Sequence, residues 1–492
     1  MQQTRIYVTK EKSILDRYPD YEATIGIEVH VQLKTKSKFF CSCLNKVTKE
    51  PNVNICQICS GYPGALPVLN KKVVDYAILF GLATNCSISR ISTFARKHYF
   101  YPDLPKDYQI TQGERPICTN GFIPIRLKDG SIKKIRIMRI HMEEDAGKNI
   151  HMPDSNESLV NLNRTGTPLL EIVTEPDIAN AQEAKAYLKA IHSIVRYLGI
   201  GTGNMDEGAF RADTNISVKK KTDKELGTRC ELKNINSFKF IGDATDYEIE
   251  RQLKLIAEGG TVKQETRLWN TLKKETAPMR TKEEAADYRY FQDPDLPLIQ
   301  VNDEWISRIK QILPELPYER FDRLVKEGLT PYEADILVTD LALSNYYQEA
   351  AQHTKSKHLV NLILRDLMGH LKEKKISLSE CKVTPKKLAE LVDLLDKGTI
   401  NSRAAQEVFT VVAQTGGDPS EVVKNKGLEQ IGSVDKLEKI VQEIIATNTK
   451  QVEQYKGGNE RVFGFFVGQA MKKTQGRGNP KILQNLLKKY LK

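Results

Sequence analysis

The stretch TIGIEVHVQLK, residues 24–34, decides the fold of the first half of the chain. Glu28, His30 and Gln32 alternate in it with five apolar residues, which are Ile25, Ile27, Val29, Val31 and Leu33. Because successive side chains of a strand point to opposite faces, this alternation is typical of a strand with one buried and one polar face. We therefore expect a half-buried strand here, with Glu28 and His30 on its polar face.

Strand-like segments continue to about residue 300, and the rest of the chain reads as helices. The further strand candidates are RIMRIHM, SLVNLN, PLLEIV, FRADTNISV and RCELKNI. Beyond Pro317 the segments carry helix caps, such as Thr384 before Pro385, and the glycines of TGGD near Gly416 indicate a boundary. The sequence therefore predicts an α+β protein in four parts: an N-terminal extension over residues 1–21, a large β-rich domain over 22–303, a helical domain over 304–412 and a small helical tail over 413–492.

The composition indicates a soluble globular protein of two or three domains. Of its 492 residues, 40% are hydrophobic and 28% are charged, and no stretch approaches the roughly 20 apolar residues of a membrane span. The N-terminus mixes charges throughout and lacks the apolar core of a signal peptide, so we expect a cytoplasmic protein. The 74 basic and 63 acidic residues leave a net charge of +11, which favours an anionic partner.

A basic run ends the chain. From Met471 onward there are seven lysines and arginines and no acidic residue. The candidates for contact with RNA in this run are Lys472, Lys473, Arg477 and Lys481. A run of this kind binds the phosphates of RNA in many proteins, and it is equally typical of the solvated face of a helix.

Four cysteines form two close pairs, Cys41-x-Cys43 and Cys56-x-x-Cys59, with twelve residues between the pairs. Thiolates at the ends of two tight turns can together bind one tetrahedral zinc ion, and a reducing compartment argues against disulfides. The spacing therefore favours a zinc site, and the alternative is four reduced cysteines without a metal.

The stretch RIHMEEDAGK, residues 139–148, places three acids at the end of a strand candidate. Its apolar positions shift phase between Ile137 and Ile140, which indicates a bulge near Met138. The three consecutive acids are Glu143, Glu144 and Asp145. They repel one another, and either a hard cation such as magnesium or the water around an exposed turn relieves that repulsion.

Other strand candidates also present acids. Glu28 and His30 are close enough to bind one ion, although alternate polar residues of a strand more often face solvent. Glu171 lies in the apolar run PLLEIV, where a carboxylate needs a cation or a cavity. Asp213 lies on the polar face of FRADTNIS. If these faces line one cleft, they form a site for magnesium and the phosphates of a nucleotide.

Two kinds of chemistry are not indicated. The sequence has no G-x-x-x-x-G-K-[ST] loop, so it is not a P-loop ATPase. It also has neither a G-x-S-x-G elbow nor an S-x-x-K motif, so hydrolysis by a side-chain nucleophile has no candidate residue.

An ordered set of motifs points to one family. The motifs are IGIEVHVQL, SGYPGALPVLN, KHYFYPDLPKDYQITQ, RIHMEEDAGK, NLNRTGTPLLEIVTEPD, ELKNINSF, QETRLW and DYRYFQDPDLP. From about residue 22 to the C-terminus the sequence resembles the B subunit of the tRNA-dependent aspartyl/glutamyl amidotransferase. The resemblance implies a β-rich cradle, a helical domain and a small YqeY-like tail that contacts tRNA. It also implies a heterotrimer, in which the A subunit releases ammonia from glutamine and the C subunit braces the pair.

The resemblance further implies a carbon–nitrogen ligase that takes its amido group from glutamine. ATP would phosphorylate the side-chain carboxylate of Glu-tRNA(Gln) or Asp-tRNA(Asn), and ammonia would displace the phosphate. The residues leave open which of the two tRNAs is used. The rival interpretation is a zinc-containing RNA-binding module without catalysis, which leaves the buried position of Glu171 unexplained.

Matching the motifs position by position assigns roles to individual residues. The resemblance places five of them around magnesium and the nucleotide: Glu28, His30, Glu144, Glu171 and Asp213, with Glu144 as the foremost metal ligand. Lys97 and Lys106 resemble residues near the ammonia path and the acyl-phosphate. The roles of Glu143 and Asp145 remain open. The four cysteines resemble those of zinc-bearing members, which implies a structural zinc distant from the chemistry.

Overall fold

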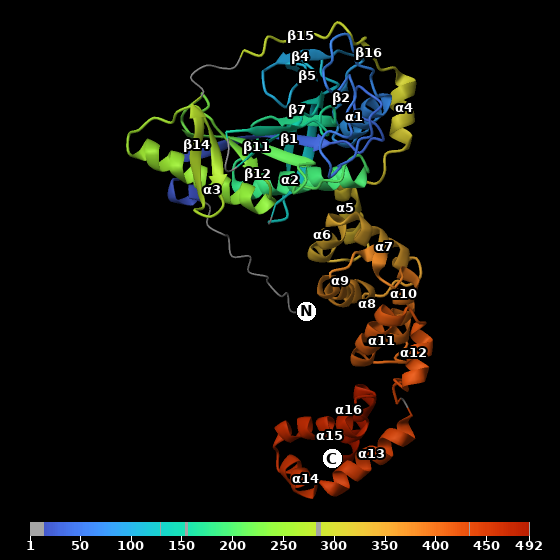
Figure 1. Cartoon of the computed structure of the whole chain (residues 1–492). Coiled ribbons are helices and arrows are strands. Elements are labelled where there is room, and N and C mark those ends of the chain that lie inside the picture. Colours follow the sequence, from blue (N-terminus) through green and yellow to red (C-terminus); the bar gives the residue numbers. More distant parts are fainter. Residues whose placement is uncertain (1–13, 128, 153–155, 282–286, 432, 492) are drawn as a thin grey trace. The chain divides into compact units, whose positions relative to one another are not determined.

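The computed structural model describes residues 14–491 apart from 128, 153–155, 282–286 and 432. The chain divides into two compact units, Met1–Arg323 and Leu324–Lys492 (Figure 1). The first unit carries the strands and the second is helical, so the α+β class predicted from the sequence is confirmed. Residues 1–13 of the predicted N-terminal extension lie outside the described residues, and the predicted boundaries at 304 and 413 stay predictions.

The first unit is built on one large mixed sheet with the strand order β14-β13-β12-β11-β1-β10-β7-β6-β2. The strands of this sheet are β1 (Tyr21–Gln32), β2 (Ser87–Ile88), β6 (Cys118–Arg126), β7 (Ile132–Glu144), β10 (Pro168–Thr174), β11 (Phe210–Lys220), β12 (Cys230–Ile235), β13 (Glu265–Asn270) and β14 (Glu275–Thr281). Short strands form smaller sheets: β3 (Ile91–Ser92), β4 (Ala95–His98), β5 (Tyr108–Thr111), β8 (Lys148–His151), β9 (Ser158–Asn161), β15 (Phe291–Gln292) and β16 (Ile299–Gln300). The stretch that opens the sequence analysis is thus a central strand of the sheet.

Helices cover the apolar face of this sheet. The helical elements of the unit are η1 (Ile14–Arg17), α1 (Lys71–Ala83), α2 (Ala181–Tyr197), α3 (Phe238–Ala257), α4 (Asp303–Gln311) and α5 (Pro317–Lys326), the last of which crosses the boundary between the units. Helix α1 contacts β6 and β7, α2 contacts β6 and α3, and α3 contacts β11 (Figure 1). The apolar side chains of β1 are buried in this core, which confirms the predicted alternation and leaves Glu28 and His30 on the other face.

The predicted bulge near Met138 is confirmed. Strand β10 pairs with β7 so that Val173 lies opposite Arg139 and Thr174 lies opposite Ile137, which leaves Met138 as the extra residue. A one-residue bulge moves the following side chains to the other face of a sheet. As a result, the alternate residues His141 and Glu143 point to the polar face, whereas Ile140 and Met142 are buried in the core.

A buried ionic network ties α3 to the far strands of the sheet. Glu248 is fully buried and accepts hydrogen bonds from Arg251, Gln252 and Thr276. Its carboxylate also lies 3.4 Å from Nε of Arg267 on β13. Burial alone would raise the pKa of Glu248, but the hydrogen bonds from Arg251 outweigh it and lower that pKa. The network therefore stabilises the charged form and joins α3, β13 and β14.

We predict that Glu248→Ala destabilises the first unit by about 2–4 kcal/mol, because the buried Arg267 and the half-buried Arg251 then share only Glu265, and the buried Thr276 loses its acceptor. The matched control is Glu250→Ala on the same helix. The carboxylate of Glu250 lies near the surface and pairs with Lys254, so we expect this variant to lose under about 1 kcal/mol of stability. The stability of the first unit is measured by urea unfolding with tryptophan fluorescence as the signal, because both tryptophans of the chain, Trp269 and Trp305, lie in this unit. Equal midpoints for the two variants would contradict the prediction.

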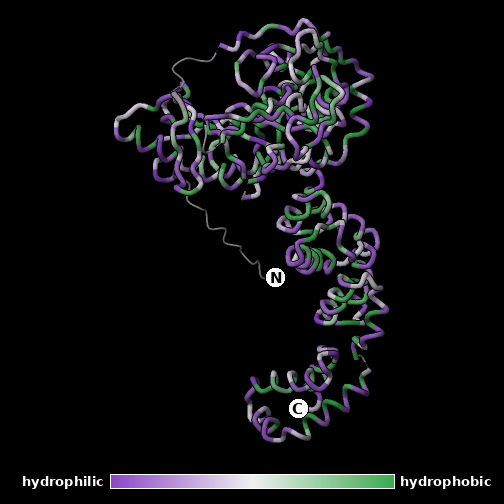
Figure 2. The backbone as a smooth tube through the Cα atoms, viewed as in Figure 1, coloured by the Kyte–Doolittle hydropathy of each residue, from purple (hydrophilic) through white to green (hydrophobic). Residues whose placement is uncertain are grey.

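The second unit is helical throughout its described elements. These are α6 (Pro331–Thr339), α7 (Leu341–Ala351), α8 (His358–Leu362), the π-helical turn η2 (Ile363–Leu367), α9 (Met368–Lys374), η3 (Leu378–Glu380), α10 (Pro385–Asp396), α11 (Ser402–Thr415), α12 (Pro419–Lys426), α13 (Val434–Thr447), α14 (Thr449–Lys456), η4 (Glu460–Val462), α15 (Phe463–Lys473) and α16 (Pro480–Leu491). The predicted cap at Thr384 is confirmed, since its side chain accepts from the amide of Lys387. The aspartate of TGGD, Asp418, also caps a helix, because it accepts from the amide of Ser420. Figure 2 shows these helices striped with hydrophobic and hydrophilic residues, as expected of amphipathic helices. Among the described residues, no helix is both long enough and apolar enough to cross a membrane.

Candidate active site and cysteine cluster

Four neighbouring strands, β7, β10, β1 and β11, bring their polar side chains together on the polar face of the sheet. In the register of β1 with its neighbours, His30 lies opposite Glu171 of β10, and Glu28 lies opposite Asp213 of β11. Nε2 of His30 is 3.6 Å from a carboxylate oxygen of Glu28 and 3.9 Å from one of Glu171. The ligand atoms of Glu28, His30 and Glu171 lie within 4.8 Å of one another, which is compatible with one metal ion.

A second group shares Glu171 with the first. Nδ1 of His141 lies 3.6 Å from the Oε1 atom of Glu171, and His141, Glu143 and Glu171 also meet the 4.8 Å criterion. Glu143 lies between the two groups, because its Oε2 atom is 4.0 Å from Nε2 of His30. The two triads together form what we call the carboxylate cluster: Glu28, His30, His141, Glu143, Glu171 and the adjoining Asp213.

Burial and mutual repulsion shift the titration of the carboxylate cluster. Burial, then the charges of Glu143 and Glu28, raise the pKa of Glu171 well above its usual range. Burial, then the charge of Asp213, raise the pKa of Glu28. Burial also lowers the pKa of His30 to about 3, with help from Arg211 and Lys97, so this imidazole is neutral at physiological pH and keeps a lone pair. The crowded acids thus favour a cation in their midst.

Glu144 lies apart from this cluster, which differs from our expectation of a foremost metal ligand there. Its side chain forms an ion pair with Lys106, and its Oε1 atom accepts from the amide of Ile110 at 3.0 Å. Gln109 donates to its carbonyl oxygen. The alternation of β7 explains the position, because Glu143 and Glu144 must point to opposite faces. The role assigned to Glu144 stays a prediction, and Glu143 joins the metal-compatible groups.

The three consecutive acids are buried, so the exposed acidic turn that the sequence left open is ruled out. Glu143, Glu144 and Asp145 are 3%, 2% and 4% exposed. Asp145 lies 3.1 Å from Arg211 and accepts from Gln32 at 2.9 Å. Each of the three acids therefore has a different set of partners: the cluster for Glu143, Lys106 for Glu144 and Arg211 for Asp145.

Two lysines border the carboxylate cluster. Burial disfavours the charged form of Lys97, but the carboxylates of Glu143 and Glu171 outweigh it and raise its pKa. The ammonium of Lys97 also lies 4.8 Å from the centre of the Tyr288 ring. At the other end, Nζ of Lys233 is 3.1 Å from Oδ2 of Asp213. Both lysines therefore keep their positive charge next to acids of the cluster.

The donor set fits a hard divalent cation. Such ions prefer carboxylate oxygens, and Glu28, Glu143, Glu171 and Asp213 supply several of them on one face. Nε2 of His141 is buried and has no hydrogen-bond partner among the described residues. A dication would offset the burial and the mutual repulsion that together raise the pKa values of Glu28 and Glu171. The residues present therefore fit magnesium at the carboxylate cluster.

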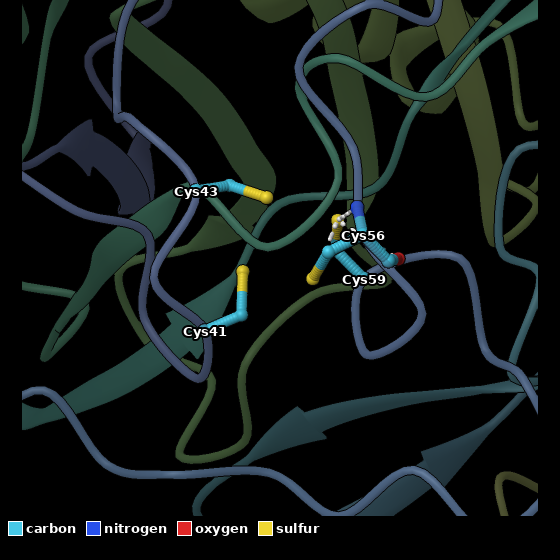
Figure 3. Close-up of side chains that lie close together, drawn as sticks. All are labelled: Cys41, Cys43, Cys56 and Cys59. Atoms are coloured by element: carbon cyan, nitrogen blue, oxygen red, sulfur yellow. Dashed lines mark hydrogen bonds between the residues drawn. The ribbon is translucent and has the colours of Figure 1, made fainter.

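The four cysteines of the predicted zinc site converge. Figure 3 shows the side chains of Cys41, Cys43, Cys56 and Cys59 pointing toward one space, and their sulfur atoms lie within 4.8 Å of one another. The sulfurs of Cys56 and Cys59 are 3.8 Å apart, the separation of about 3.8 Å that a tetrahedral ion with bonds of about 2.3 Å requires. A hydrogen bond from Cys41 lowers the pKa of Cys59 to about 4, so this thiol is ready to act as a thiolate. The donors fit zinc.

The cysteine cluster lies close to one predicted site residue, Glu144. Its predicted distance from the chemistry stays a prediction. Gly166 lies in the turn before β10. A methyl group built on it would lie 3.6 Å from Cβ of Cys59 and 3.9 Å from Oε2 of Glu144. Lys38 is fully buried beside the same glycine, donates to the carbonyl of Asn54 and lies 3.6 Å from the sulfur of Cys59. A single residue thus separates the cysteines from Glu144.

The basic residues predicted to contact RNA lie in the second unit. Lys472 and Lys473 end α15 and Lys481 lies in α16, and all three are exposed. Lys473 forms an ion pair with Glu443. Arg477 instead donates to the carbonyl of Gly427 and is half-buried. Contact with RNA stays a prediction for all four.

Sequence reasoning left several members of the site without a role. His141 and Glu143 were detectable, because the phase shift at Met138 already places them on the polar face of β7. Lys233 and Lys38 carried no such signal, since their partners Asp213 and Cys59 are brought to them by strand pairing and by the cysteine turn.

Two family models match the chain. One is described as the GatB/GatE catalytic domain and covers residues 23–307, and the other is described as the GatB domain and covers residues 345–491. These matches define a protein of the GatB class, with its catalytic domain in the first unit.

Known proteins agree with this class. The chain is similar to proteins named as the B subunit of the aspartyl/glutamyl-tRNA(Asn/Gln) amidotransferase. The one from Syntrophotalea carbinolica is 50% identical over 473 residues, which cover 96% of this chain and 98% of the relative. The one from Persephonella marina is 48% identical over 476 residues, which cover 96% of this chain and 100% of the relative. The chain belongs to the family of aspartyl/glutamyl-tRNA amidotransferase B subunits. This disfavours the alternative of a non-catalytic zinc-containing RNA-binding module.

Proposed function

We propose that the carboxylate cluster phosphorylates the side-chain carboxylate of glutamate or aspartate carried on tRNA(Gln) or tRNA(Asn), and that ammonia then converts the acyl-phosphate to the amide. The observation that carries this proposal is the grouping of Glu28, His30, His141, Glu143 and Glu171 into two metal-compatible triads that share Glu171. Phosphoryl transfer is mainly positioning and neutralisation of charge, which is the chemistry that such a group supports.

The atoms balance in two steps. In the first, an oxygen of the substrate carboxylate bonds to the γ-phosphorus of ATP while the bond to the β-phosphate oxygen breaks and ADP leaves. In the second, the nitrogen of ammonia bonds to the acyl carbon, phosphate leaves with the former carboxylate oxygen, and a proton is released. The enzyme is then a carbon–nitrogen ligase, and the amide is made on the tRNA.

The residues of this chain hold the reacting groups. Magnesium bound by Glu28, Glu143, Glu171 and Asp213 would neutralise the phosphates of ATP. Lys97 keeps its positive charge beside Glu143 and Glu171, so it is placed to bind the transferred phosphoryl group. His30 and His141 are neutral, because burial lowers both pKa values to about 3. They therefore add no charge that would compete with the cation.

The partners follow from the absence of a nucleophile suited to release ammonia. We propose that an A subunit supplies ammonia from glutamine, that a C subunit completes the heterotrimer, and that the exposed Lys472, Lys473 and Lys481 bind tRNA phosphates, with Arg477 beside them. We place the assembly in the cytoplasm, where mischarged tRNA is made.

The experiment is reconstitution of the heterotrimer with Glu-tRNA(Gln) or Asp-tRNA(Asn), ATP, magnesium and glutamine. We expect Gln-tRNA or Asn-tRNA to form, and no amide without ATP. The tRNA that reacts identifies the substrate. Amide formation that continues without ATP, or no amide with either tRNA, would contradict the proposal.

We also propose that the cysteine cluster holds zinc and that Lys38 is its counter-cation, because this fully buried ammonium lies 3.6 Å from Cys59. Lys38→Met should lower zinc affinity about 10–100-fold, as loss of a partner outside the ligands commonly does. Lys36→Met is the matched control, since Lys36 is exposed two residues away. Competition with a chelating dye measures both, and equal zinc retention by the two variants would overturn the role of Lys38.

A further inference from the structure

The turn that carries Cys56 and Cys59 packs directly on the segment that carries Lys106. Gly61 follows this turn with φ of +71°, and a methyl group on it would lie 2.9 Å from the carbonyl carbon and oxygen of Pro105 and 3.1 Å from Cγ of Lys106. Real Cβ atoms essentially never approach to 2.9 Å, so the two backbones meet with no room for a side chain. The amide of Gly61 also donates to the carbonyl of Ile58 inside the cysteine turn. The position of Lys106 therefore depends on the position of this turn.

The other side of the cysteine cluster meets Glu144. Cys59 and Lys38 flank Gly166, and Gly166 in turn lies against the carboxylate of Glu144. Backbone hydrogen bonds run through the same residues, because the amide of Phe39 donates to the carbonyl of Gly166 and the amide of Gly166 donates to that of Asp145. The amide of Lys38 also donates to the carbonyl oxygen of Cys43, which joins the first cysteine pair to the same segment.

These two contacts reach the two partners of one ion pair. Lys106 and Glu144 are bonded to each other, and their side chains are 9% and 2% exposed. The pair also includes the amide of Ile110, which donates to Glu144. The cysteine cluster therefore contacts Lys106 through Gly61 and the carboxylate of Glu144 through Gly166, so its position determines the position of both partners of the ion pair.

We propose that the cysteine cluster is a positioning device for the Lys106–Glu144 pair, so that a displacement of the cysteine turn slows amide formation without unfolding the protein. Gly61 and Gly166 are the positioning residues, and they act through Lys106 and Glu144. The inference rests on the proposed function. Gln109 joins the pair to the carboxylate cluster, because its side chain donates both to the Glu143 carboxylate and to the Glu144 carbonyl. A misplacement of about 1 Å away from the reacting atoms can cost about 100-fold in rate.

The test compares two alanine variants of the same turn in the reconstituted heterotrimer. Gly61→Ala must push Pro105 and Lys106, whereas Gly64→Ala is the matched control, because Gly64 also has positive φ, +80°, and a methyl group on it meets nothing within 4 Å in the described chain. Both changes carry the same backbone strain. We expect Gly61→Ala to lower kcat for amide formation about tenfold or more, with KM for ATP and tRNA within about twofold of the wild type. Gly64→Ala should stay within about twofold in kcat as well.

A second readout does not use activity. Hydrogen exchange of residues 101–112, followed by mass spectrometry, should be faster in Gly61→Ala than in Gly64→Ala, because the Ile110 amide loses its fixed acceptor. Should Gly61→Ala fail to accumulate folded, Cys56→Ser replaces it, because it removes one of the four converging sulfurs of the cysteine turn and adds no atom against Pro105 or Lys106. Equal kcat and equal exchange in test and control variants would overturn the inference. A wild-type complex that makes no amide would instead contradict the proposed function, and the exchange comparison would still decide the inference.

Discussion

Glu171→Gln is expected to lower the rate of amide formation at least about 1000-fold while raising the stability of the protein. Glu171 belongs to both metal-compatible triads, so its replacement by a neutral amide weakens both at once. The loss of a group that acts on the charge of a phosphoryl transfer typically costs about 10³–10⁵ in rate. Binding of tRNA should not change, because the substitution keeps the size of the side chain.

The stability of this variant should move the other way. Burial and the neighbouring acids raise the pKa of Glu171, which means that its charged form is disfavoured in the folded protein at neutral pH. A neutral glutamine removes this cost, so the midpoint of thermal unfolding should rise without magnesium. Glu175→Gln, just beyond the end of β10, is the control and should change neither quantity. An active Glu171→Gln complex would contradict the site assignment.

Glu144→Gln is expected to lower amide formation about 100-fold and, in contrast, to destabilise the protein by about 3–5 kcal/mol. The stability effect differs from that of Glu171→Gln because Glu144 is paired with a buried lysine, Lys106. Glu144 neutralises Lys106, whose side chain is 9% exposed, and the substitution leaves that ammonium buried without its counter-charge. Steady-state kinetics and urea unfolding of the same preparations measure the two effects.

The double variant Glu144→Gln with Lys106→Met separates the two effects of the pair. It should recover part of the lost stability, because no buried charge remains unpaired, whereas its rate of amide formation should stay at least as low as that of Glu144→Gln. If Glu144→Gln retained both wild-type stability and wild-type activity, the ion pair would have neither role. If the double variant were less stable than either single variant, the two residues would not act as a pair.

Local patterns predicted the local features of this fold. The alternation around Glu28 predicted β1, the phase shift predicted the bulge at Met138, and the two cysteine pairs predicted a four-sulfur cluster. The strand and the bulge depend on residues within a few positions of one another, and the four-sulfur cluster on two close pairs within one short segment, so strand geometry or motif spacing is sufficient to derive each.

The grouping of the site needed the structure. Glu28, Glu143 and Glu171 come from three strands, and only the strand order and register place them together. The choice between Glu143 and Glu144 was nevertheless within reach of the sequence, since the bulge at Met138 determines which of the two joins the polar face. The closeness of the cysteine cluster to Lys106 was not, because Gly61 and Pro105 are brought together by long-range packing.

Transfer of oxygen from the substrate to phosphate tests the central claim most directly. Glu-tRNA(Gln) or Asp-tRNA(Asn), labelled with ¹⁸O in the side-chain carboxylate, is amidated by the reconstituted complex, and the released phosphate is analysed by mass spectrometry. The account predicts one ¹⁸O atom from the carboxylate in each phosphate formed with an amide, and loss of that signal in Glu171→Gln. Amide formation with unlabelled phosphate would contradict phosphorylation of the carboxylate at this site.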